Sequence, residues 1–210
     1  MVQPSLSGTL QQPIFSLNQP APPTPSMQSL TRIQVLVAIA ATALVLFIIA
    51  RLWLLLGAVQ QLSSQFGLHA VGLGILLGVG ITLVSGVLYK CWGTYRRSAN
   101  VYLDYILTPL VLPDVLWLGL LPGISEEFLF RGVMLPALGA SWLALAISSL
   151  CFGLLHMSDL RQWPYMLWAT CVGVLLGGSA LITGNLLVPV VAHVFTNMVS
   201  SLVWKLKITH

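Results

Sequence analysis

The 210-residue chain is 57% hydrophobic and only 7% charged, and its mean hydropathy is +0.93. Soluble domains are about a quarter charged, so this composition excludes an ordinary soluble globular protein. The net charge of +4 does not indicate nucleic-acid binding, because most Lys and Arg residues stand at the ends of apolar runs and form no basic stripe. The sequence therefore predicts an all-α, polytopic membrane protein that binds no nucleic acid.

The N-terminal segment differs from the rest of the chain. Pro, Gln and Ser dominate residues 1–28, and no charged residue precedes Arg32. Such a segment cannot bury enough apolar surface to fold by itself. We therefore predict a disordered tail over residues 1–30.

Two hydrophobic runs follow the tail. They cover about 33–57 and 68–89, each close to the roughly 20 residues that cross a bilayer core. Small residues in the second run predict close packing against neighbouring helices. These are Gly72, Gly74, Gly78, Gly80 and Gly86. Residues 90–100 contain three basic residues, Lys90, Arg96 and Arg97. They predict a polar, basic loop that ends an N-terminal region of 31–100.

Residues 101–210 are predicted to form the membrane core that carries the polar motifs. An interfacial or broken segment leads into a helix over about 114–136, and further spans cover about 141–157, 163–183 and 186–204. With six spans in total, the connections that contain Lys and Arg fall on one side of the membrane. The positive-inside rule then places both termini in the cytoplasm.

The stretch "GISEEFLFRG", residues 123–132, holds Glu126, Glu127 and Arg131 within an otherwise apolar region. Glu127 and Arg131 are four residues apart and can pair on one helix face. Glu126 points in another direction without a cation, which suits it to take a proton from water. Alternatively, the three residues form an interfacial charge cluster at a helix start, with Ser125 as the N-cap.

Two later runs contribute imidazole groups. "CFGLLHM" places Phe152 and His156 on one helix face, and "VAHVFTNM" places His193 and Asn197 one turn apart. Polar groups in a bilayer core are costly, so we expect them to face a cavity or each other. Water activated by Glu126 and His156 could attack a peptide carbonyl, while His193 and Asn197 stabilise the oxyanion. Alternatively, Glu126, His156 and His193 bind a zinc ion that activates the water.

These motifs resemble those of the CPBP family of intramembrane proteases, which includes CAAX endopeptidases and bacteriocin-processing or immunity proteins. "EEFLFR" is similar to the family's EExxxR motif, "FGLLH" to FxxxH and "HVFTN" to HxxxN, in the same order over about 114–204. The resemblance implies a general base that acts with an imidazole on water, a supporting ion pair and an oxyanion-side pair. The corresponding residues are Glu126 with His156, Glu127 with Arg131, and His193 with Asn197.

The expected function is therefore an intramembrane endopeptidase, metal-free or metal-assisted, in a bacterial inner membrane or thylakoid-type membrane. The resemblance implies a protein or peptide substrate, which in this family includes membrane-anchored and prenylated proteins. Two other functions stay open. One is a non-proteolytic scaffold or bacteriocin-immunity protein, and the other is a small transporter that uses Glu126 and the histidines as a proton relay. A relay does not need the His193–Asn197 pair, and no repeat relates 33–89 to 114–204.

Overall fold

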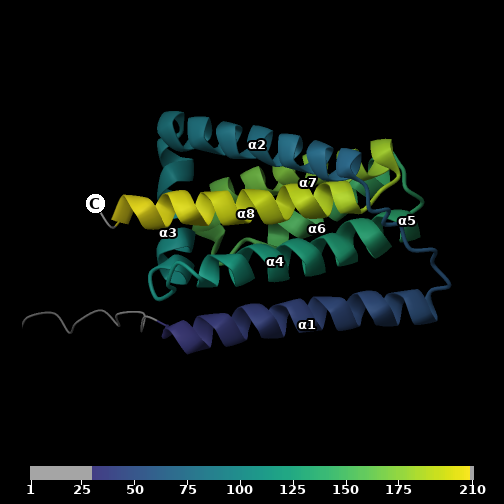
Figure 1. Ribbon diagram of the computed structural model, residues 1–210, viewed down its shortest axis with the longest axis horizontal. Helices are drawn as coiled ribbons and strands as arrows, with labels where there is room; N and C mark the ends of the chain where they lie inside the picture. The colour runs from purple at the N-terminus through teal and green to yellow at the C-terminus, as the bar shows by residue number, and fades with distance from the viewer. Residues whose placement is uncertain (1–29, 209–210) are drawn as a thin grey trace, which may run out of the picture.

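The structure is a computed structural model that describes residues 30–208, and every regular element in this range is helical. The predicted all-α fold is confirmed. Most helices run side by side along the long axis of the molecule (Figure 1). Except for Leu30, the predicted N-terminal tail over residues 1–30 lies outside the described residues.

Four helices of the described chain are long and apolar enough to cross a membrane. They are α1 (Arg32–Leu56), α2 (Leu68–Cys91), α7 (Trp163–Thr183) and α8 (Leu187–Ile208). Two further segments match the remaining predicted spans. The first is α4 (Asp114–Glu127), which continues through the π-helix η1 (Phe128–Met134) into α5 (Leu135–Ala137). The second is α6 (Trp142–Leu155). Six spans is therefore an approximate count, because α6 has only 14 residues and the α4 segment changes its helix type.

The polar loop predicted over residues 90–100 is wrong. Most of it belongs to α3 (Gly93–Leu107), which lies across one end of the bundle, nearly perpendicular to the long helices (Figure 1). This helix is amphipathic, and its buried face carries Tyr95, Ser98, Ala99 and Leu107. Basic residues on the opposite face gave the segment the composition of a loop, although its apolar residues recur with a helical period. A short 3-10 turn, η2 (Leu160–Gln162), accepts a hydrogen bond from Ser98 through the Gln162 side chain.

Helix α8 lies between α2 and α4 (Figure 1) and contacts both closely. Gly74 and Gly78 of α2 confirm the predicted role of small residues, because a Cβ atom at either position would overlap α8. Gly123 of α4 allows the same approach from the other side, where a Cβ atom would lie 2.6 Å from Val194. The prediction is wrong for three glycines of α2 that face open space, namely Gly72, Gly80 and Gly86.

Helix α1 is fastened to the start of α4 by an ion pair. The guanidinium of Arg32 donates two hydrogen bonds to the carboxylate of Asp114, at 2.7 and 2.8 Å. Further along, Phe47 stacks on Phe128 with ring centroids 4.8 Å apart. These contacts hold α1 along the segment that contains both glutamates of the acidic motif.

Large apolar side chains cover much of the outer surface. Leu55, Leu83 and Leu143 are each at least 65% exposed. Soluble monomers rarely present apolar surface on this scale. The long apolar helices and their exposed leucines are compatible with an integral membrane protein.

Candidate active site

The acidic motif lies where α4 changes into a π-helix. Glu126 and Glu127 end α4, and Arg131 belongs to η1. Short π-helical segments leave some backbone carbonyls without their usual intrahelical donors and are frequent at functional sites. The carbonyl of Phe130 accepts from the backbone N–H of Leu135 and, in addition, from the hydroxyl of Ser148 at 3.1 Å. Pro136 has no N–H and cannot donate a hydrogen bond to the carbonyl of Gly132. This carbonyl accepts instead from the backbone N–H of Leu62 at 2.9 Å.

The alternative of a charge cluster at a helix start is wrong. Ser125 does not cap a helix, since its hydroxyl donates to the carbonyl of Leu121 within α4. Glu126 and Glu127 follow in a helix that is continuous through η1. The two carboxylates are therefore held by a continuous helical backbone in the interior of the bundle.

Glu127 is the centre of a buried polar chain. One of its carboxylate oxygens, Oε1, accepts from Nη1 of Arg131 at 2.8 Å and from Nδ1 of His193 at 2.8 Å. Arg131 also donates from Nη2 to the carbonyl of Gly173 at 2.8 Å. The side chains of Glu127 and Arg131 are 0% and 1% exposed, so each charge depends on the other for compensation. The predicted pairing of Glu127 with Arg131 is present.

The ring of Phe152 packs against this buried chain. The guanidinium of Arg131 lies over the ring at 4.4 Å from its centroid. The imidazoles of His156 and His193 lie beside the same ring, with centroids 4.7 and 5.6 Å from its centroid. Phe152 is therefore an apolar contact that both histidines share.

Glu126 and His156 form the second polar group of the site. Oε2 of Glu126 lies 3.8 Å from Nε2 of His156, and this oxygen has no hydrogen-bond partner within the described residues. Nδ1 of His156 is 2.9 Å from the carbonyl of Phe152, which can only accept, so Nδ1 carries the proton. In the neutral ring Nε2 is then an acceptor that faces the carboxylate. A gap of this width between two acceptors suits a bridging water molecule.

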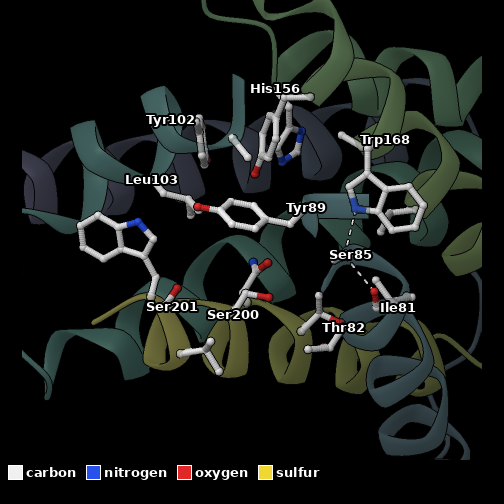
Figure 2. A pocket seen from close by; sticks show the side chains of 18 of the residues that line it. Ile81, Thr82, Ser85, Tyr89, Tyr102, Leu103, His156, Trp168, Ser200 and Ser201 are labelled. Atoms are coloured by element: carbon white, nitrogen blue, oxygen red, sulfur yellow. Dashed lines mark hydrogen bonds between the residues drawn. The ribbon is translucent and has the colours of Figure 1, made fainter. Parts of the chain in front are cut away.

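The site contains one cavity with a volume of about 430 Å³. Glu126, His156, His193 and Asn197 all line it, so the structure brings together the predicted acid, imidazole and amide groups from α4, α6 and α8. Glu127 and Arg131 lie behind this wall. Figure 2 shows Tyr102 and His156 on one side of the cavity and Ser200 and Ser201 on the other.

Sequence reasoning missed the tyrosines that line this cavity. Tyr102 of α3 stacks on Tyr165 of α7 at 4.7 Å, and both rings lie beside His156. Burial raises the pKa of Tyr102 above its ordinary value, and the charge of the Glu126 carboxylate adds to the shift, so the phenol stays protonated. No motif marks these residues. The helical period of α3 was the available signal, since it places Tyr102 one turn from Ala99 on the buried face.

The predicted zinc ligands, Glu126, His156 and His193, are not arranged as a metal site. Within residues 30–208, no three His, Cys, Asp or Glu side chains are grouped so that they could hold a metal ion. His193 directs Nδ1 to Glu127, and His156 directs Nδ1 to a backbone carbonyl. As these side chains lie, they do not fit a three-ligand zinc centre.

Residues 108–199 match the model of a protein family described as "Type II CAAX prenyl endopeptidase Rce1-like". The matched segment contains both carboxylates, the arginine, both histidines and the asparagine of the site. The match supports a CPBP-type intramembrane protease at the level of the family.

A curated protein shows a longer similarity. The chain is 29% identical over 164 residues to the "Uncharacterized protein YpbD" of Bacillus subtilis (strain 168), which covers 78% of this chain and 81% of that protein. This alignment is longer than the segment 108–199, so it includes part of the N-terminal half. No solved structure is significantly similar to the chain.

Proposed function

We propose that the protein is a multi-pass intramembrane endopeptidase in which Glu126 and His156 activate a water molecule. One observation carries this proposal: Oε2 of Glu126 and Nε2 of His156 lie 3.8 Å apart at the wall of one cavity, and the carboxylate oxygen has no protein partner. A water between them donates one hydrogen to each acceptor. Its oxygen lone pairs then face the cavity, where a substrate carbonyl would lie.

The reaction begins when the water oxygen attacks the carbonyl carbon of a peptide bond and its proton passes to Glu126. The resulting oxyanion needs hydrogen-bond donors on the other side of the carbonyl. The carboxamide of Asn197 provides one. His193 provides a second from Nε2 when its ring is protonated, because Nδ1 is held by the carboxylate of Glu127.

The intermediate collapses when Glu126 returns its proton to the nitrogen of the leaving group. The C–N bond breaks, and the products are a carboxylic acid and an amine. Glu126 thus acts first as a base and then as an acid. Arg131 takes no part in proton transfer. It holds Glu127, which in turn orients His193.

We also propose the orientation of the protein and the class of its substrate. The end of the bundle that carries α3, the start of α1 and the end of α8 contains most of the basic residues, and the positive-inside rule places this end in the cytoplasm. Both termini are then cytoplasmic. The substrate is a protein or peptide presented at the membrane. This class includes prenylated proteins, because the matched family is described as a CAAX prenyl endopeptidase family.

A cleavage assay with purified protein in proteoliposomes tests this function. Peptide products from a membrane-protein fraction are identified by mass spectrometry for the wild type, Glu126→Gln and His156→Ala. We expect each variant to lose at least about a hundredfold in rate, the contribution of a general base. Asp104→Asn is the matched control, because Asp104 is an exposed carboxylate of α3 that does not line the cavity.

Full activity of Glu126→Gln would exclude this mechanism. A folded wild type that cleaves nothing in the fraction would favour the non-proteolytic scaffold or immunity protein.

A further inference from the structure

Most hydroxyl groups in the long helices are satisfied within their own helix. Thr82 and Ser85 of α2 donate to the carbonyls four residues earlier, both at 2.8 Å, and Thr170 of α7 does the same at 3.0 Å. This back-bonding is the usual solution for a hydroxyl in an apolar environment. It leaves such side chains little capacity to bind a ligand.

Helix α8 departs from this pattern. Ser200 and Ser201 both line the cavity, and neither hydroxyl has a hydrogen-bond partner within residues 30–208. The carboxamide of Asn197 also lines the cavity without a protein partner in that range. Figure 2 shows Ser200 and Ser201 on the wall opposite Tyr102 and His156. These three side chains therefore present unused donors and acceptors to the cavity.

The three residues continue the face of α8 that begins at His193. We call His193, Asn197, Ser200 and Ser201 the α8 polar stripe. At a rise of 1.5 Å per residue it extends about 12 Å along the helix. An extended peptide advances about 3.3 Å per residue, so about four residues would lie along the stripe.

We propose that the α8 polar stripe binds about four residues of substrate in an extended conformation, on one side of the peptide bond that is cut. This inference rests on the proposed function and specifies how the substrate is held. It requires that the backbone of the substrate, rather than an attached hydrocarbon chain, contacts α8.

The chemistry of the stripe favours a peptide backbone. Hydroxyl and carboxamide groups both donate and accept, which matches the alternating N–H and C=O groups of an extended strand. A hydrocarbon chain in the same place would leave all three side chains buried without partners, which is unfavourable. A helical segment already uses its own N–H and C=O groups internally and would offer none to the stripe.

The test measures binding without catalysis. Short random peptides are selected for binding to the Glu126→Gln variant in nanodiscs, and the affinity of one selected peptide is measured by fluorescence anisotropy. The Ser200→Ala/Ser201→Ala double variant in the same background should bind about tenfold more weakly, as the loss of two ordinary hydrogen bonds predicts. Ser179→Ala is the matched control, because that hydroxyl donates to the carbonyl of Leu176 and does not line the cavity.

A second arm separates binding from a structural effect. The peptide is shortened stepwise from each end. With the wild-type stripe, removal of the peptide residues that contact the stripe should weaken the affinity of the peptide by about tenfold. In the double variant, the same removal should cost little, because the interaction is already lost.

Unchanged affinity of a double variant that unfolds at the wild-type temperature would overturn the proposal. Equal losses for full-length and shortened peptides, or a library that yields no bound peptide, would do the same. These outcomes can be distinguished from a failure of the proposed mechanism. If Glu126→Gln still cleaves peptides, the mechanism fails while the binding measurement still tests the stripe.

Discussion

Nδ1 of His193 lies 2.8 Å from Oε1 of Glu127 and so links α8 to the end of α4 across 66 positions of sequence. The contact is almost fully buried, with side-chain exposures of 5% for His193 and 0% for Glu127. It fixes the orientation of the imidazole and leaves Nε2 as the nitrogen available to the cavity. The geometry of one wall of the candidate active site thus depends on a carboxylate that does not line that wall.

Replacement of Glu127 should affect stability far more than replacement of Glu126. Glu127→Gln leaves the buried guanidinium of Arg131 without a compensating charge, which typically costs about 3–5 kcal/mol. Glu126→Gln removes a carboxylate that pairs with no cation in the described chain, and we expect a change below about 1 kcal/mol. Thermal unfolding of the two variants in detergent measures the difference. Equal unfolding temperatures would show that the Glu127–Arg131 pair does not carry the assigned role.

Gly173 should be a positioning residue for the site. A Cβ atom there would lie 3.1 Å from Ser149 and 3.2 Å from Nη2 of Arg131, and the Gly173 carbonyl accepts from that same nitrogen. Gly173→Ala should therefore displace the guanidinium and destabilise the fold by about 1–3 kcal/mol. Cleavage should fall in kcat with little change in KM, because His193 is disturbed through Arg131 and Glu127.

Gly178→Ala in the same helix is the matched control for Gly173→Ala. No atom lies within 4 Å of a Cβ atom at this position, so alanine fits without any rearrangement. We expect wild-type cleavage and a neutral or slightly stabilising effect on unfolding. The same loss of kcat in both variants would contradict the positioning role.

Labelling with a membrane-impermeant maleimide tests the proposed orientation. Cys91 is exposed at the end of α2, beside α3, and becomes the single target once Cys151 and Cys171 are replaced by alanine. We expect labelling from the cytoplasmic side only. Gln60→Cys in a chain without the native cysteines places the target in the connection between α1 and α2, where labelling should occur only from the opposite side. Labelling of both positions from the same side would contradict the orientation.

Cleavage should persist after metal removal. The predicted zinc ligands do not form a three-ligand group within the described residues, and His193 is already bonded to Glu127. We therefore expect the rate to stay within about twofold after dialysis against a chelator, and no gain when zinc is added, because zinc catalysis needs at least three protein ligands. Metal content is measured on the same samples. A loss of activity that only a divalent metal restores would establish the metal-assisted mechanism.

Several features of the fold follow from local sequence. The long helices could be located because a bilayer core requires about 20 consecutive apolar residues, a signal that does not depend on any tertiary contact. The pairing of Glu127 with Arg131 could also be predicted from local sequence, because residues four apart are neighbours on the surface of any helix. The helix α3 was missed because its basic residues resemble the composition of a loop. Its apolar face is buried only by packing across the end of the bundle.

The sequence by itself determined the helical class, the approximate spans and the residue types of the candidate site, because helix periodicity and hydrophobicity act over short distances along the chain. Only the tertiary structure decided that His193 bonds to Glu127, that Tyr102 lies beside His156, and that Ser200 faces the cavity. Each of these depends on how helices distant in sequence are rotated and packed against one another. That packing is set by the summed contacts of many side chains, which no single motif records.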